Sequence, residues 1–593
     1  MASERKDSDG GWLPIGKAEG LRGAGPFHAT AGGEELVLVR GAAGLRAFEG
    51  RCPHQGALLA EGEVDGADLV CRNHRWRFDL DTGQRRDGSG CLRPCPLEVR
   101  DGEILVQPGV LSATAPPAAR PRTLSDLPGP RRLPLLGNLP SLGLERLHAT
   151  LERWAARFGP VFRVDFGPRP MIVVDDAALI QQALRDRPGT FRRLGTIEPV
   201  FRELGIDGIF SAEGVDWRPL RRLTLEALAP AHLRSFYPTL RAVVERLQRR
   251  WSAAAEVGRA VDLEEDFKRF TVDLTTQLAF GHDLNTLEDE GDVLQRRLEH
   301  VFPGITRRLF ATVPWWRLVR LPIDRRLERA VHDVFALLRE LLAAARARLE
   351  ADPSRAASPH NFLEAMIAAR DDGRPFSDAQ VLGNAIQILL AGEDTTALTL
   401  SWAVHELCDA PDSAAAMAAE ADAVLGASLS PVDFETAGRL EVAGAVAQET
   451  MRLRPVAPLV ILQANRDTVL GDVAIPPGQS VCLLMRRPAA APEHFADPGA
   501  FRPGRWLQRT EGQAHDPSAH MPFGSGPRLC PGRSLALLEM RVALGTLYRS
   551  FTVERVGERA GVTERFAFTM APVGLRVRLA RRDPRAPAEA TAG

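Results

Sequence analysis

The distribution of apolar residues divides the chain into a short β-type region and a long helical one. From Gly20 to Gln107, short runs rich in branched side chains are separated by glycine turns, a pattern typical of an all-β domain. These runs are ELVLVR, GLRAF, DLVCR and EILVQ. Farther along, apolar residues recur with the spacing of a helix. We expect helices over 142–158, 215–250, 325–350, 378–410, 439–452 and 533–549.

A segment without periodicity separates the two regions. Residues 110–127, VLSATAPPAARPRTLSDL, are rich in proline and alanine, which is typical of a linker. In polyproline form this segment would span roughly 55 Å, enough for one domain to swing over the other. The pattern therefore predicts four parts: a β domain at 1–109, a linker at 110–127, a helical domain at 128–581 and a disordered tail at 582–593.

Composition narrows the class of protein. The chain has 593 residues, 45% of them apolar and 25% charged, so it is globular and long enough for more than one core. A formal net charge of −1 gives no reason to expect nucleic acid as a partner. Neither a signal-peptide pattern nor a long uncharged apolar run is present, so we expect no membrane span and a cytoplasmic location. Lysine occurs only at 6, 17 and 268, which favours a bacterial source with GC-rich coding.

One glycine-rich loop carries a cysteine into a helix. Residues 523–540 read FGSGPRLCPGRSLALLEM, with the predicted helix beginning near Arg533. A thiolate at Cys530 would be favoured there, because helix N–H groups and the helix dipole both point at it. Arg528 adds a cation, and the glycines allow close approach of a bulky partner. Such a loop suits a flat, anionic cofactor. A lone cysteine is more often core filler, but ten motif residues outweigh that interpretation.

The stretch FGSGPRLCPG resembles the haem-binding signature of the cytochrome P-450 family, F-G-x-G-x-R-x-C-x-G, at every defined position, Phe523 included. The resemblance implies that Cys530 is the axial thiolate of haem b and that Arg528 pairs with a haem propionate. In the family a W-x-x-x-R pair also holds the propionates, and here it is Trp217 with Arg221.

Two further segments resemble the same family. AGEDTT at 391–396 resembles its oxygen-activation stretch, where the helix kinks, Thr395 steadies dioxygen and Asp394 supplies protons. The alternative is that Thr395 bonds back to its own helix. Glu449-x-x-Arg452, joined in the family by an arginine that is Arg505 here, would form a buried ion-pair triad with a structural role, holding the cysteine loop.

The β domain carries a second candidate centre. Cys52-Pro-His54 is followed after sixteen residues by Cys71-Arg-Asn-His74 and then by FDLDTG. This spacing resembles the Rieske ferredoxin family, in which two thiolates hold one iron of a 2Fe-2S cluster and two imidazoles hold the other. Zinc is the alternative, because Cys2His2 sets also bind it.

Residues near these ligands indicate the properties of the cluster. Trp76 and Phe78 stand where high-potential Rieske proteins carry serine and tyrosine, so the potential should lie near the low end of the range, on the order of −150 mV. Arg72 and Arg75 make the cluster tip basic, which would suit an acidic reductase face.

Together the resemblances imply a multidomain protein: a small all-β Rieske domain followed by a mainly-α cytochrome P-450 fold with minor β-sheets. The implied function is a monooxygenase that uses O2 and electrons from its own cluster. No G-x-G-x-x-G fingerprint opens a βαβ unit, so we expect a separate NAD(P)H-dependent ferredoxin reductase. An apolar lining predicts a lipophilic substrate. The expected lining residues are Ala385, Ile386, Ile388, Leu389, Val456, Ala457, Leu459, Val460 and Phe568 to Met570.

Two other functions compete with this one. A Rieske ring-hydroxylating oxygenase would need an acid and two histidines around a mononuclear iron. His515 and His520 have suitable spacing, but Gly512 stands where the acid should be, so we expect both histidines to be surface residues. A non-catalytic haem redox or gas sensor would not need Asp394 and Thr395.

Overall fold

The computed structural model describes most of the chain. The described residues are 12–21, 23–42, 44–53, 57–72, 75–86, 91–107, 120–289, 301–311, 313–357, 359–371, 374–507 and 515–582. The predicted ligands His54 and His74 lie outside them, as do Gly512, residues 108–119 of the linker region and residues 583–593 of the predicted tail.

The first region is all-β, as its alternating pattern predicts. It holds the antiparallel sheets β2-β3-β4-β8, β1-β10-β9 and β5-β6-β7. The strands are β1 Leu13–Lys17, β2 Phe27–Ala31, β3 Glu34–Gly41, β4 Gly44–Glu49, β5 Glu63–Asp65, β6 Asp68–Val70, β7 Arg77–Asp79, β8 Pro94–Cys95, β9 Leu97–Arg100 and β10 Glu103–Val106.

The position of strand β3 between two cores explains why its sequence is almost continuously apolar. Leu36 and Leu38 face one core, shared with Ile104 of β10. Val37 and Val39 face the opposite core, which also contains Cys52, Cys71 and Phe78. Because successive side chains point to opposite faces, a strand covered on both sides has to be apolar at every position.

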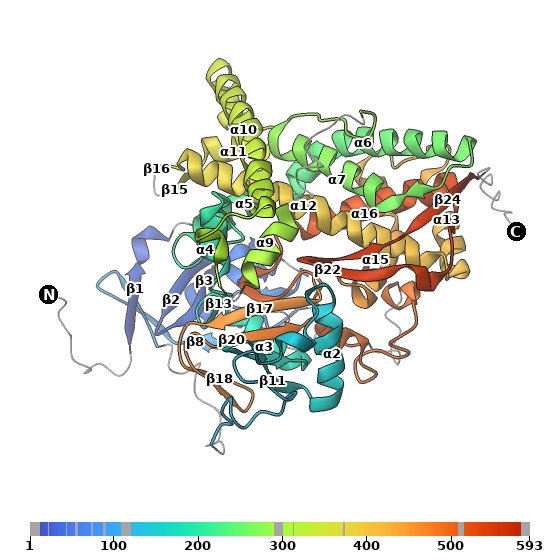
Figure 1. Ribbon diagram of the computed structural model, residues 1–593. Helices are drawn as coiled ribbons and strands as arrows, with labels where there is room; N and C mark the ends of the chain where they lie inside the picture. Colours follow the sequence, from blue (N-terminus) through green and yellow to red (C-terminus); the bar gives the residue numbers. More distant parts are fainter. Residues whose placement is uncertain are drawn as a thin grey trace, which may run out of the picture.

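The second region is mainly helical, with small sheets beside the helices (Figure 1). Its helices are α2 Leu147–Phe158, α3 Ala177–Arg185, α4 Ile197–Glu203, α5 Trp217–Ala227, α6 Pro230–Glu256, α7 Leu263–Phe280, α9 Val301–Leu309, α10 Pro322–Ala351, α11 Phe362–Ala368, α12 Asp378–Leu407, α13 Pro411–Leu425, α14 Phe434–Gly438, α15 Glu441–Leu453 and α16 Arg533–Ser550.

The sheets of this region are small, and the largest has the order β11-β12-β20-β17-β13. The strands are β11 Val161–Phe166, β12 Arg169–Val174, β13 Phe191–Arg193, β14 Val261–Asp262, β15 Arg370–Asp371, β16 Arg374–Pro375, β17 Leu459–Ala464, β18 Thr468–Leu470, β19 Val473–Ile475, β20 Ser480–Leu484, β21 Phe551–Arg555, β22 Thr563–Ala567, β23 Thr569–Val573 and β24 Arg576–Arg581.

Helix α12 is the central helix, and nearly all its side chains are buried. It begins with a capping box, in which Ser377 accepts from the backbone of Gln380 and the Gln380 side chain accepts in return. Its apolar residues join two separate cores, one with α6, α7 and α16 and one with α10 and α11. The helix therefore connects most of the domain.

The predicted helices match α2, α10, α12, α15 and α16 closely, but the expected helix over 215–250 is wrong as a single element. The structure has two helices, α5 and α6, and Pro230 is the first residue of the second. Proline lacks an N–H group and clashes with the preceding turn, so it starts a helix readily and does not continue one.

The last part of the predicted linker packs against the helical region. Arg122 makes a two-pronged ion pair with Asp472, at 2.7 Å for both contacts, and bridges to Val473 of β19. Leu127 joins an apolar cluster there. At the other end, the Arg582 backbone donates to Ser550 O, so Arg582 does not belong to a free tail. Within the described residues, no helix is long and apolar enough to cross a membrane.

Candidate functional site

The loop that carries Cys530 is held by its own backbone and by α3. The Cys530 N–H donates to Phe523 O at 3.0 Å, which closes the loop in front of α16. Gly526 has a φ of 71°, and a Cβ there would lie 2.5 Å from Leu184 O, so only glycine fits. Removal from water raises the pKa of the Cys530 thiol, while nearby N–H groups and arginines act in the opposite direction.

Trp217, Arg221 and Arg528 lie together beside this loop, as predicted for a propionate site. Arg221 on α5 donates from Nη1 to Leu529 O at 2.5 Å. The Arg528 guanidinium lies over the Trp217 ring, 4.3 Å from its centroid, and donates to Glu213 at 2.7 Å.

Two arginines that the sequence did not single out complete this group. Arg187 is buried and lies close enough to Arg193 and Arg528 for electrostatic repulsion, and Arg193 interacts with Cys530 and Glu213. Burial lowers the pKa of Arg528 to about 9 and that of Arg193 to about 10. Nearly every basic residue of the chain is arginine, so nothing in the sequence marks these two.

The charges of this group fit haem. Arg187, Arg193, Arg221 and Arg528 each keep at least one buried guanidinium nitrogen without a hydrogen-bond partner among the described residues. The carboxylates that interact with them are Glu213 and, from the first domain, Glu61. The four arginines carry more positive charge than these two carboxylates offset, and the propionates of haem b are anions of the kind that would complete the balance.

One face of α12 is less buried than the rest of the helix, and we call it the open face. Ile388, Ala391, Gly392 and Thr395 are exposed or half-buried, three or four residues apart, while their neighbours on the helix are buried. Ala385, Ile386 and Leu389 are buried in the core formed with α10 and α11, and their predicted role in lining the substrate site stays a prediction.

Asp394 and Thr395, the acid and the hydroxyl residue of AGEDTT, make contacts within the protein that the resemblance did not imply. Helix α12 continues through this stretch without a break, and the Thr395 hydroxyl donates to Ala391 O at 2.9 Å. The open alternative, a bond back to its own helix, is therefore the observed geometry. Asp394 is buried and accepts from the Thr569 hydroxyl, and Lys268 of α7 lies 3.4 Å from its other oxygen.

Lys268 is held between two carboxylates. Its ammonium also donates to Glu264 at 2.8 Å. Burial alone would lower the pKa of Lys268, but Asp394 and Glu264 outweigh this and raise it, so the side chain is a cation. No local pattern marks Lys268 or Thr569 as a partner of Asp394, because both contacts join segments far apart in the chain.

Three phenylalanines from separate segments meet near the open face. Phe568 lies in the turn between β22 and β23 with a φ of 76°, which is unusual for a bulky residue. Its ring stacks on Phe302 of α9 at 5.3 Å and lies 5.8 Å from Phe210. Arg193 lies over the Phe210 ring at 3.8 Å, so this aromatic group reaches the haem-site arginines.

The predicted ion-pair triad is present and buried. Arg452 makes two hydrogen bonds to Glu449, at 2.8 and 2.9 Å, and both side chains are fully buried. Arg505 donates to Glu449 at 3.1 Å, and Trp506 adds an indole N–H at 2.9 Å. Arg452 also donates to three backbone carbonyls of residues 489, 498 and 500. The triad thus ties α15 to the segment that precedes the cysteine loop.

The expectation that His515 and His520 lie on the surface is wrong for His520, whereas His515 is half-buried. His515 stacks on Phe495 at 5.5 Å and meets Trp506 at 4.8 Å. His520 is buried, bonds to Gln448 at 3.1 Å, and burial lowers its pKa to about 3. They pack around Trp506. Among the described residues, no group of three or more His, Cys, Asp and Glu side chains could hold a metal ion.

Two cysteines of the first domain, Cys52 and Cys71, lie at matching positions in two loops. The Cys52 N–H donates to Ala57 O, and the Cys71 N–H donates to Trp76 O, both at 2.8 Å. Each bond closes a loop of six residues, and both cysteines are buried in one apolar cluster. Two thiol-bearing loops that meet in one core fit the thiolate half of a 2Fe-2S site.

Trp76 and Phe78 are apolar side chains at the two positions where high-potential Rieske proteins carry hydroxyl groups. Phe78 is fully buried in the same cluster as the two cysteines, and its ring lies 6.4 Å from that of Trp76. Of the two arginines in the predicted basic tip, Arg72 contacts the helical region and Arg75 pairs within the first domain. Arg72 donates to Leu225 O of the helical region at 3.2 Å, and Arg75 pairs with Glu63 at 2.5 Å.

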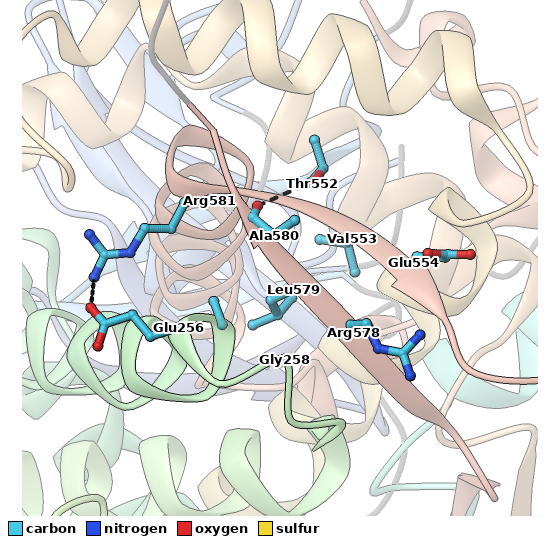
Figure 2. Close-up of a pocket in the computed structure, with 10 residues that line it drawn as sticks. Glu256, Gly258, Thr552, Val553, Glu554, Arg578, Leu579, Ala580 and Arg581 are labelled. Carbon is cyan, nitrogen blue, oxygen red and sulfur yellow. Dashed lines mark hydrogen bonds and ion pairs between the residues drawn. The ribbon is translucent and has the colours of Figure 1, made fainter.

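A surface pocket of about 620 Å3 lies elsewhere, between the end of α6 and the strands β21 and β24. Figure 2 shows Glu256 reaching across to Arg581, with Val553 and Leu579 between the strands. None of its lining residues belongs to the sites described above.

Comparison with known families and structures agrees with this geometry. The family model "Cytochrome P450" matches residues 127–578, and "Rieske [2Fe-2S] domain" matches residues 11–95. The mitochondrial 25-hydroxyvitamin D-1 alpha hydroxylase of Mus musculus is 31% identical over 463 residues, covering 73% of this chain and 87% of that protein.

Two further matches differ in extent. A self-sufficient cytochrome P-450 monooxygenase of Penicillium expansum is 26% identical, over 77% of this chain and 43% of that protein. The crystal structure of a cytochrome P-450 haem domain, P-450DA, superposes with a TM-score of 0.70 at 22% identity, covering 79% of this chain and 99% of that one. These relatives do not indicate a bacterial source, which stays a prediction.

Glu449→Gln should destabilise the protein by roughly 3 to 5 kcal/mol, because it leaves Arg452 and Arg505 buried without a counter-charge. Urea unfolding and retention of haem measure the effect. The matched control is Glu435→Gln, which removes an exposed carboxylate paired with Arg234. Equal stability of the two variants would contradict the structural role of the triad.

Trp76→Ser combined with Phe78→Tyr should raise the cluster potential by roughly 100 mV, because hydroxyl groups would donate to the cluster sulfurs and stabilise the reduced state. Redox titration followed by EPR measures it. Phe27→Tyr places a hydroxyl in the core on the other side of the sheet and should change nothing. A potential that stays the same in the double variant would show that solvent or charge sets it.

Proposed function

The chain belongs to the cytochrome P-450 family and carries a Rieske domain ahead of the haem domain, and from this premise we propose that it hydroxylates or epoxidises a lipophilic substrate. It is a monooxygenase with haem and a 2Fe-2S cluster as cofactors. The proposal extends to the roles of single residues, the substrate class and the source of electrons.

The observation that carries the proposal is the group of four arginines around the Cys530 loop. Each of the four has a buried guanidinium nitrogen without a hydrogen bond to the described part of the chain, and this supports Cys530 as the axial ligand and Trp217, Arg221 and Arg528, with Arg187 and Arg193, as the propionate site. Thiolate-bound haem supplies the activation of O2 and the insertion of one oxygen atom. Cys52 and Cys71, with His54 and His74, are the proposed cluster ligands.

The contacts of Asp394 support a role in proton delivery. Lys268 lies 3.4 Å from one oxygen of Asp394, and the Thr569 hydroxyl donates to the other. Both contacts hold the carboxyl group in place, so it can pass protons from a fixed position. Thr395 lies next to it on the open face of α12, and turning its hydroxyl away from Ala391 O would let it act on bound oxygen.

The side chains around the open face support a lipophilic substrate. Ile388 and Ala391 come from α12, and Phe302 and Phe568 stack beside them in the domain. Met570 N donates to Val456 O at 2.9 Å, which brings the predicted lining runs around Val456 and Phe568 together. Apolar walls bind by area, at about 25 cal/mol per Å2 removed from water, and favour a fatty acid or terpenoid.

Electrons require a further protein. The matched family models at 11–95 and 127–578 are neither flavin nor nicotinamide modules. We therefore propose that a separate NAD(P)H-dependent ferredoxin reductase reduces the cluster, which then reduces the haem.

A spectroscopic titration tests the function. Reduced protein under carbon monoxide should show the Soret band of thiolate-ligated haem, because Cys530 binds as a thiolate. Fatty acids, sesquiterpenes and steroids are then titrated against the low- to high-spin Soret shift, which reports water displaced from iron. A Soret band typical of imidazole ligation would refute the ligand, and a shift with polar metabolites alone would refute the substrate class.

Thr395→Ala should keep haem and substrate binding but divert oxygen to peroxide, with product formation falling on the order of 100-fold. The ratio of product to NAD(P)H consumed measures this coupling. Thr399→Ala is the matched control, because Thr399 also bonds back by one turn, to Thr395 O at 2.8 Å, and is buried. Equal coupling in both variants would argue against the role of Thr395.

A further inference from the structure

The two cysteine loops of the Rieske domain contact the haem domain directly. Arg185, at the end of α3, donates to Pro53 O at 3.1 Å, and Pro53 follows Cys52 in the chain. Arg72, which follows Cys71, donates to Leu225 O of α5 at 3.2 Å. Each loop that bears a proposed cluster ligand thus meets a different helix of the haem domain. Figure 1 shows the blue strands of the first domain beside α5.

Three charged contacts surround these two. Arg51, which precedes Cys52, donates to Arg187 O at 3.1 Å. Glu35 of β3 pairs with Arg218 of α5 at 3.0 Å, and Glu61 lies 3.7 Å from Arg221 Nε. Arg221 is therefore shared between the Cys530 loop and the Rieske domain.

The same helices pack against the haem loop from their other side. Leu184 O of α3 lies where a Cβ on Gly526 would approach to 2.5 Å, and Arg221 of α5 donates to Leu529 O. A single layer of chain, the end of α3 and one face of α5, therefore separates the cysteine loops of the Rieske domain from the loop of Cys530.

We propose that this interface is the docked surface through which the Rieske cluster delivers electrons to the haem, with Glu35–Arg218 and Glu61–Arg221 holding the two domains in register. This inference rests on the proposed function. Each transfer moves one electron: the reduced cluster is oxidised by one unit and ferric haem iron is reduced by one. The reductase refills the cluster, so its docking surface lies on the Rieske domain.

A charge exchange at Glu35 and Arg218 tests the docking, because neither residue belongs to a proposed cofactor site. Full-length protein is kept anaerobic under carbon monoxide, a photoreductant reduces the cluster, and the rate of appearance of the reduced haem–CO band is followed. Glu35→Arg and Arg218→Glu should each slow transfer about tenfold, because like charges then face each other. The double variant, with the pair reversed, should recover most of the rate.

Two controls separate docking from other effects. Glu35 also bonds to His28, so His28→Ala should transfer at the rate of the wild type. Arg234→Glu breaks an equally exposed pair with Glu435 on the helical domain and should also leave the rate unchanged. The spin relaxation of the reduced cluster gives a second measurement. Nearby haem should make this relaxation faster, and the acceleration should weaken in the two single variants and return in the double variant.

Single variants that transfer at the wild-type rate, or a double variant as slow as the single ones, would overturn the interface. The carbon monoxide Soret band and the cluster EPR signal should be the same in every variant, which shows that both centres are intact. Absence of these two signals from the wild type would instead refute the proposed function, and the interface with it.

Discussion

The structure of the haem site depends on how buried positive charge is balanced. Arg187, Arg193, Arg221 and Arg528 converge behind the Cys530 loop, and a guanidinium removed from water without a partner is costly. Glu213 offsets part of this charge, and an aromatic face, that of Trp217, covers one of the four. The remaining positive charge favours an anionic cofactor. The arginines beside the Cys530 loop would therefore be stabilised by the anionic groups of such a cofactor.

The charge balance also links the two domains. Arg221 reaches the Cys530 loop through Nη1 and faces Glu61 of the Rieske domain through Nε. Burial raises the pKa of Glu61, and Arg221 and Arg72 oppose that rise. Because the three groups share one partly dry region, a change of charge on one of them alters the environment of the other two.

The sequence predicts those parts of the site that lie within one motif. The Cys530 loop, the i, i+3 pair Glu449–Arg452 and the two cysteine loops are local patterns with fixed spacing, and the structure holds them together as expected. Arg187, Lys268 and Thr569 could not be predicted, because each meets its partner across a large sequence distance. His520 was misplaced for the same reason, since its burial against Trp506 depends on tertiary packing. The split of 215–250 had a local signal in Pro230, which helical periodicity alone overlooks.

The structural role of Gly392 differs from the predicted one, although it lies in the expected motif. The sequence suggests a kink at this glycine, yet α12 is continuous there. A Cβ on Gly392 would lie 2.7 Å from Thr275 Oγ1, so the missing side chain lets α7 approach α12 closely. That approach also brings Lys268, two turns earlier on α7, within reach of Asp394. The glycine therefore places Lys268 beside Asp394 through helix packing, because a larger residue would push away the helix that carries the lysine.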